Sequence, residues 1–190
     1  NANNISLDVI DLKFQAELKW KLFRKLELSA LGALKYSATS QEHKIRENSN
    51  QALAYRAMGD GTIINRNSWL YKDPDDPYAL PVSILPKGGF YNTAQYKMLS
   101  YDFRAAASYN DVFNDTHIVN VYAGMESNAQ NRTANSFDGW GMQYENGEIP
   151  FFDYLAFKKL REGNTNYYDL TNTKKRNVAF FGTATYSYKG

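Results

Sequence analysis

Apolar and polar side chains alternate along residues 11–42, the most regular stretch of the chain. From Leu12 to Leu22 every second residue is apolar, and the residues between them, such as Lys13 and Glu17, are polar or charged. Successive side chains of a β-strand point to opposite faces of a sheet, so this alternation predicts a strand with one apolar and one charged face. Residues 26–36 repeat the pattern less regularly. The short interval between the two arms predicts an antiparallel hairpin.

Both arms are longer than the strands of about 5–6 residues that are common in soluble proteins. The ten steps from Leu26 to Tyr36 rise about 23 Å at a tilt near 45°, which is close to the apolar band of an outer-membrane barrel. Trp20 and Tyr36 stand near the two ends, where aromatic belts meet the membrane surface. The length and the aromatic ends of the hairpin therefore predict that it forms part of the wall of a membrane β-barrel. The residues expected to face lipid are Phe14, Leu18, Trp20, Leu28, Tyr36, Tyr109 and Val121.

The same alternation returns three more times and divides the chain into strands and long loops. The strands are expected at about residues 7–22, 26–42, 96–110, 116–130 and 176–189. The extracellular loops are expected at about residues 43–95 and 131–175, with helices at 50–58, capped by Asn48 or Ser49, and at 150–161. Connections that alternate between short and long are typical of barrels with tight periplasmic turns and large outer loops. Since five strands cannot close a barrel, we expect an internal piece of a larger one.

Composition and motifs exclude several classes of protein. The 22 basic and 20 acidic residues nearly balance, so no charge-driven nucleic-acid partner is expected. The chain has no cysteine, and neither histidine, His43 nor His117, has a companion at metal-binding spacing. Nucleophile, phosphate-loop and dinucleotide motifs do not occur, so we expect no enzyme and no cofactor. Residues 73–76 carry three aspartates, which could bind Ca²⁺ or form a solvated turn.

Four aromatic residues in the long loops are candidates for contact with a ligand or with a capping protein. They are Trp69, Tyr71, Trp140 and Tyr144. Aromatic faces can stack on sugars or pack against peptide side chains. The same residues could instead form small cores within the loops, and the sequence leaves both interpretations open.

Three stretches resemble the barrel of the SusC/RagA family of TonB-dependent outer-membrane transporters. They read SYDFRAAASYNDVFNDTHIVNVYAGMES, FDGWGMQYENGEIPFFDY and RNVAFFGTATYSYKG. Two earlier stretches, ENSNQALAYRAMGDGT and SWLYKDPDDPYALPVSILPKGGF, are similar to the long extracellular loop that precedes these strands in the family. The resemblance covers essentially the whole chain but only a minority of a family member.

The resemblance implies an all-β fold, a segment of an antiparallel transmembrane β-barrel of about 22 strands. It also implies a location in the outer membrane of Bacteroidetes, in contact with membrane lipid. The expected partners are a SusD/RagB-like surface lipoprotein and TonB, with oligosaccharides or oligopeptides as cargo, and two such complexes can pair as a dimer. The plug domain, the TonB box and the remaining strands have no counterpart in this sequence, so coupling to TonB is inferred from the family alone.

A soluble β-sandwich or jelly roll that binds carbohydrate through its aromatic residues is the alternative. In that fold the apolar face would be buried against a second sheet, and the strands would be short. Phe14, Leu18 and Val121 would then belong to a core. Strand length and the covering of the apolar face distinguish the two readings.

Overall fold

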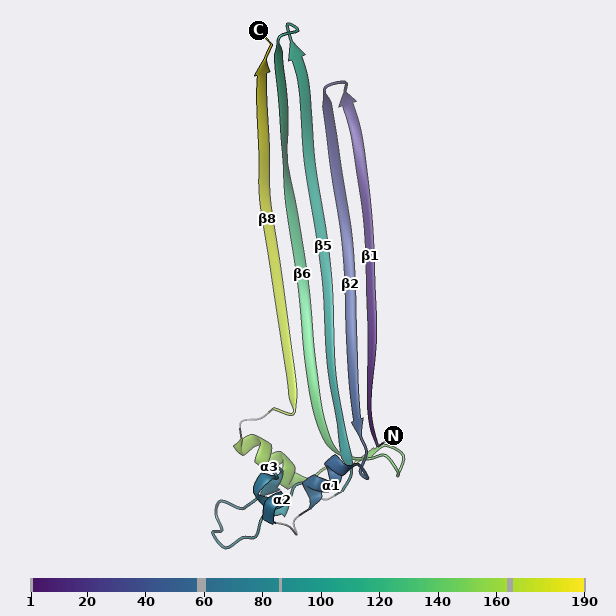
Figure 1. Ribbon diagram of the computed structural model, residues 1–190, viewed down its shortest axis with the longest axis vertical. Helices are drawn as coiled ribbons and strands as arrows, with labels where there is room; N and C mark the ends of the chain where they lie inside the picture. The colour runs from purple at the N-terminus through teal and green to yellow at the C-terminus, as the bar shows by residue number, and fades with distance from the viewer. Residues whose placement is uncertain (1, 58–60, 86, 164–165, 190) are drawn as a thin grey trace. The chain divides into compact units, whose positions relative to one another are not determined.

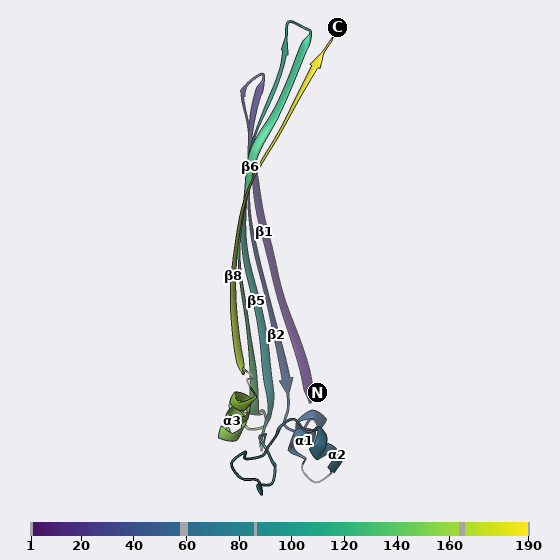
Figure 2. The ribbon, with the colours of Figure 1, turned by 90° about the vertical axis from the view of Figure 1, so that its left-hand side faces the viewer.

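Five long strands dominate the structure, a computed structural model that describes residues 2–57, 61–85, 87–163 and 166–189. The strands are β1 (Asn3–Phe23), β2 (Leu26–Ile45), β5 (Gly89–Phe113), β6 (His117–Gln143) and β8 (Tyr168–Tyr188). Their order in the sheet is β1-β2-β5-β6, and β8 pairs with β6 (Figures 1 and 2). The fold is an antiparallel all-β barrel segment, as the alternation predicted. None of the helices described is long and apolar enough to cross a bilayer.

The strands extend beyond the bounds expected from the sequence. β5 begins at Gly89, and β6 continues to Gln143, so parts of both expected loops are strand. Residues 168–175 also belong to β8, and residues 111–113, expected in a turn, belong to β5. The side chains of 131–139 are largely polar on both faces, so these positions carry no alternation although the backbone continues the ladder. Alternation marks where one face is apolar, and a strand can continue past that point.

The contacts within the chain divide it into two compact units. The loop unit comprises Asn1–Asp8, Thr39–Gln95 and Ala134–Leu170. The strand unit comprises Val9–Ala38, Tyr96–Thr133 and Thr171–Gly190. Each unit is described by itself below.

Two short turns connect the strands of the strand unit, in agreement with the prediction. Arg24 and Lys25 join β1 to β2, and the Lys25 carbonyl accepts a hydrogen bond of 2.9 Å from the Asn110 N–H. Between β5 and β6, Asn114 and Asp115 have φ values of 51° and 55°. Asn and Asp tolerate this left-handed conformation better than most residues, which suits them to a tight turn.

In the described residues of the loop unit, the structure has three helices and three two-residue strands. The helices are α1 (Asn50–Arg56), α2 (Gly61–Arg66) and α3 (Tyr154–Glu162), and the strands are β3 (Leu70–Tyr71), β4 (Val82–Ser83) and β7 (Ile149–Pro150). The Ser49 hydroxyl accepts the Ala52 N–H and caps α1, as predicted, although Met58 at the expected helix end lies outside the described residues. The expected start of α3 at residue 150 was wrong, because the Asp153 carboxylate caps the helix and Pro150 lies in β7.

Two small buried clusters hold the loop unit together. One contains Ile45, Ala52, Leu85 and Phe90, and the other contains Tyr71, Ile84 and Ala156. Trp69 and Trp140 pack against both clusters. The second cluster combines residues of both predicted loops, so the two segments fold on each other to form one core.

Replacing Leu85 by alanine should destabilise the loop unit. Leu85 is fully buried at 0% exposure, and truncation of such a side chain costs about 2–5 kcal/mol of unfolding free energy. Limited proteolysis should then cut within residues 61–85 at lower protease concentration. Leu80→Ala is the matched control, because Leu80 is 83% exposed. Equal cleavage of the two variants would contradict the assigned core.

Candidate functional site

The Trp69 ring is the centre of an aromatic cluster in the loop unit. Its centroid lies 5.7 Å from that of Tyr55, 5.2 Å from that of Phe90 and 6.1 Å from that of Trp140. The contacts with Phe90 and Trp140 are edge to face, a favourable arrangement that adds about 0.5–1.5 kcal/mol per pair to the burial of the rings. The cluster joins α1, β5 and β6 to the segment before β3.

A pocket of about 280 Å³ opens beside this cluster, within the loop unit. Of the residues that the structure describes, five aromatic side chains line it: Tyr55, Trp69, Phe90, Trp140 and Tyr167. Ile45 and Gly139 add apolar surface, and the polar lining consists of Gln51, Asn92, Asp138 and Asn166. The lining residues come from both segments that the sequence predicted as loops, residues 43–95 and 131–175. The pocket therefore forms only when both segments are folded.

Close backbone packing shapes the strands that carry two of these rings. A side chain at Gly89 would collide with the backbone of Ile45 and Arg46, and one at Gly88 would collide with the backbone of Gly141. Gly88 and Gly141 also have positive φ values, which glycine adopts at little cost. These positions allow the segments next to Phe90 and Trp140 to approach closely.

Tyr144 anchors the turn that follows β6. Its hydroxyl donates a hydrogen bond of 2.6 Å to the Phe90 carbonyl, and burial raises the pKa of the Tyr144 phenol to about 12. The Glu47 carboxylate accepts the N–H groups of Tyr144 and Glu145 at 3.2 and 2.9 Å. Desolvation raises the pKa of Glu47, but these backbone hydrogen bonds outweigh it and the pKa is lowered. The turn is therefore fixed to the residues that follow β2.

Lys159 attaches α3 to the segment that enters β3. Its Nζ atom donates to the carbonyl oxygens of Ser68 and Leu70, the latter at 2.5 Å. Burial lowers the pKa of Lys159, since desolvation disfavours the ammonium form. This contact holds α3 against the segment that carries Trp69.

The four aromatic candidates of the loops take different positions. Trp69 and Trp140 pack against the core clusters and also line the pocket, so they form part of a small core as one interpretation expected, and their contact with a ligand stays a prediction. Tyr71 lies in the second cluster with 5% exposure, and the Lys158 Nζ atom is 5.3 Å from its ring centroid. Tyr144 serves as an anchor and does not line the pocket. No sequence signal identified Tyr55, Phe90, Asp138 or Tyr167 as pocket residues, because their segments meet only in the folded chain.

The aspartates of residues 73–76 stabilise turns. Asp73 Oδ1 accepts the Asp75 N–H at 3.1 Å, and Asp76 Oδ1 accepts the Tyr78 N–H at 2.9 Å. Over the described ranges, no group of three or more His, Asp or Glu residues is placed to hold a metal ion. These hydrogen bonds are the ones expected of the turn interpretation of this segment.

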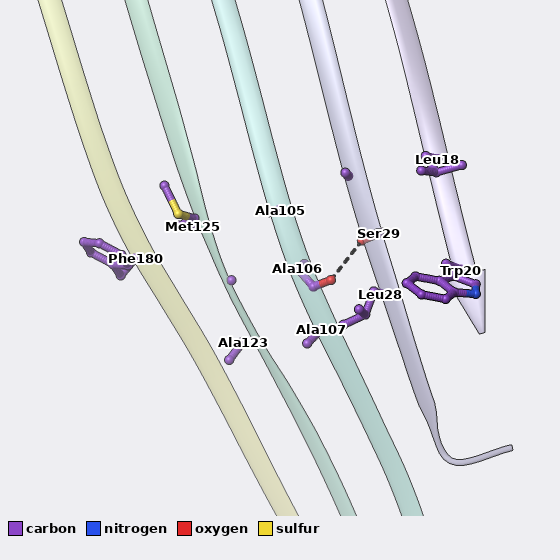
Figure 3. A pocket seen from close by; sticks show the side chains of 12 residues that line it. Leu18, Trp20, Leu28, Ser29, Ala105, Ala106, Ala107, Ala123, Met125 and Phe180 are labelled. Carbon is purple, nitrogen blue, oxygen red and sulfur yellow. Dashed lines mark hydrogen bonds between the residues drawn. The ribbon is translucent and has the colours of Figure 1, made fainter. Parts of the chain in front are cut away.

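The strand unit carries an apolar face on which large side chains are uncovered. Phe14, Leu18 and Trp20 are 70%, 69% and 62% exposed, and Val121 is 37% exposed. Leu28, Tyr36 and Tyr109 are half-buried among their neighbours. A hollow of about 550 Å³ lies on this face, with alanines of β2, β5 and β6 between larger side chains (Figure 3). The larger side chains are Leu18, Trp20, Leu28, Met125 and Phe180.

Polar contacts occupy the alternate positions of the same strands. Asn128 donates to Asp102 and, at 3.3 Å, to the Ser100 hydroxyl. Arg104 donates to the Tyr122 hydroxyl at 3.4 Å and lies 4.8 Å from the Phe181 ring centroid. Since neighbouring residues of a strand point to opposite faces, the sheet has one apolar face and one hydrogen-bonded polar face.

Solved structures with the same fold come from a peptide transport system. The chain is similar to the RagAB peptide transporter, at a TM-score of 0.64, and to the RagAB peptide importer in its closed-closed and open-open states, at 0.65 and 0.64. Sequence identity is 12% in each case, so the likeness concerns the fold. Each alignment covers 98% of this chain and 16% of the neighbour. Comparisons with family models and with curated proteins give no match.

Replacing Tyr144 by phenylalanine should weaken the loop unit at neutral pH. The change removes the hydrogen bond to Phe90, worth about 0.5–1.5 kcal/mol of unfolding free energy. A phenol with a raised pKa in the folded state stabilises the fold below the unfolded value of 10.0 and loses this effect as the pH rises toward about 12.

The difference between wild type and Tyr144→Phe should therefore shrink between pH 10 and pH 12. Limited proteolysis across this range measures it. Tyr78→Phe is the matched control, because Tyr78 is 92% exposed. A difference that stays constant up to pH 12 would contradict the proposed anchoring by the neutral phenol.

Proposed function

We propose that this chain forms part of the barrel wall of a SusC/RagA-type transporter in the bacterial outer membrane. The observation that carries the proposal is the two-faced sheet of five long strands, with large apolar side chains uncovered along one face. In water, each uncovered Å² of apolar surface forgoes about 25 cal/mol of stabilisation. Against lipid acyl chains the same face is already in an apolar medium.

The sheet edges support the same proposal. Among the described residues β1 pairs with β2 alone and β8 with β6 alone. Unpaired N–H and C=O groups cost several kcal/mol each within a bilayer, so membrane strands close into barrels. Further strands beside β1 and β8 would complete the wall. A soluble sandwich would require a second sheet over the apolar face, and in the described residues the side chains of that face on β1 are exposed.

In this proposal the protein imports a large nutrient, and the loop unit is extracellular. The RagAB neighbours support transport as the general role, and a RagB- or SusD-like lipoprotein is the partner that follows by analogy. TonB would supply energy through a plug domain, as in the family. Oligopeptides and oligosaccharides are both candidate cargoes, because a shared fold does not distinguish between them.

Extraction of the intact protein from its native envelope tests the membrane assignment. The protein should leave the membrane fraction only with detergent, and it should migrate differently on a gel with and without boiling, as stable barrels do. Sequencing of the co-purifying proteins should reveal a surface lipoprotein. A protein that is released by salt or buffer alone, with no shift on boiling, would contradict the barrel.

Adjacent residues of β1 should report opposite environments in the bilayer. Phe14 is assigned to lipid and its neighbour Gln15 to the aqueous face. We expect a nitroxide on Phe14→Cys to be relaxed strongly by oxygen, which concentrates in lipid, and one on Gln15→Cys by a water-soluble nickel complex. The chain itself has no cysteine that would interfere. The two labels would show the same accessibility if β1 were not part of the barrel wall.

A further inference from the structure

We infer that the loop-unit pocket is a subsite for an organic cation, such as the guanidinium or ammonium group of a basic peptide side chain. Among the described residues that line it, Asp138 is the only acidic one, and none is a lysine or an arginine. The Asp138 carboxylate makes no ion pair with another described residue. A ligand with a positive charge would therefore find one uncompensated negative charge in the wall.

The aromatic rings that line the pocket suit the same ligand. A cation is attracted to the face of an aromatic ring, and the attraction is larger when water is displaced. Tyr55, Trp69, Trp140 and Tyr167 contribute rings to a single small pocket. Gln51, Asn92 and Asn166 add amide oxygens that can accept hydrogen bonds from an ammonium or a guanidinium group.

The size of the pocket limits the ligand to one such group at a time. Pockets that enclose a whole drug-sized molecule have volumes of about 300–1,000 Å³. This pocket, at about 280 Å³, lies just below that range and would take one side chain of a longer cargo. The remainder of the cargo would lie outside the pocket.

The main competitor is a sugar ring, which also uses aromatic stacking and amide hydrogen bonds. The rings in the pocket are engaged with each other, since Trp69 contacts Tyr55, Phe90 and Trp140 at 5.2–6.1 Å between centroids. Trp140 and Tyr167 likewise meet edge to face at 6.3 Å. Mutual packing of this kind leaves less open ring face for a sugar, whereas a compact cation needs only part of a face.

A binding titration on the full-length protein purified in detergent tests the inference. The probes are N-acetyl-arginine amide and its neutral isostere N-acetyl-citrulline amide, with N-acetyl-lysine amide and choline to compare cation types. We expect the arginine probe to bind more tightly than the citrulline probe. Asp138→Asn should lower the affinity for the arginine probe about five- to tenfold and leave that for the citrulline probe unchanged.

Asp75→Asn is the matched control, because it removes the same charge from the loop unit at a residue outside the pocket. It should leave both affinities unchanged. Equal affinity for charged and neutral probes, no binding of any cation, equal effects of the two variants, or binding of an oligosaccharide that Asp138→Asn weakens would each overturn the inference. A choline affinity equal to that of the arginine probe would support the cation site and indicate that it is not restricted to side chains.

The inference rests on the proposed function only in taking a transported peptide as the source of the cation. The two can fail separately. If the protein were released from the membrane fraction without detergent, the transporter proposal would be wrong, but the titration would still test the cation site. If the pocket did not prefer charged over neutral probes, the cation site would be wrong, but the barrel proposal would stand.

Discussion

The pleat of the β-ladder is the constraint on which the structure depends. Because neighbouring residues of a strand must point to opposite faces, a sequence that alternates over many residues produces a sheet with two chemically different surfaces. Along β1 this places Phe14, Leu18 and Trp20 on one face, and across β5 and β6 it places the Asp102–Asn128 and Arg104–Tyr122 contacts on the other. A shift of one residue in register would move the apolar side chains of a strand to the polar face, so the alternation favours one register of strand pairing over its neighbours.

The loop unit is ordered although only a small part of it is buried in a core. Trp69 does this by packing against two small clusters together with Trp140, while Lys159 and Glu47 tie separate segments through backbone groups. Hydrogen bonds between a charged side chain and backbone groups contribute more than neutral ones. The loop unit is thus held by a few large rings and a few charged anchors in place of an extensive core.

Local patterns explain which parts of this architecture could be predicted from the sequence. The strands, the short turns and the Ser49 cap follow from residues that are close together in the chain. The extra length of β6 could not be predicted, because residues 131–139 are largely polar on both faces and only the partner strand identifies them. The extra length of β5 was missed because residues 89–95 do not alternate regularly between apolar and polar side chains. The pocket was also beyond prediction. Tyr55 and Asp138 are 83 positions apart by their numbers, and their proximity depends on how both loops fold.

Two tryptophans contribute both to the core of the loop unit and to the lining of the pocket, and this affects how the pocket would bind a ligand. Trp69 and Trp140 line the pocket and also pack against the buried clusters, so the packing of the loop unit fixes the shape of the pocket. The lining side chains therefore need little further ordering when a ligand binds. Preorganisation of this kind improves affinity by reducing the entropic cost of binding. It also means that substitution of either tryptophan would disturb folding and binding together. The Asp138 side chain is exposed and makes no ion pair with another described residue, so its charge can be removed while the aromatic rings of the pocket keep their packing.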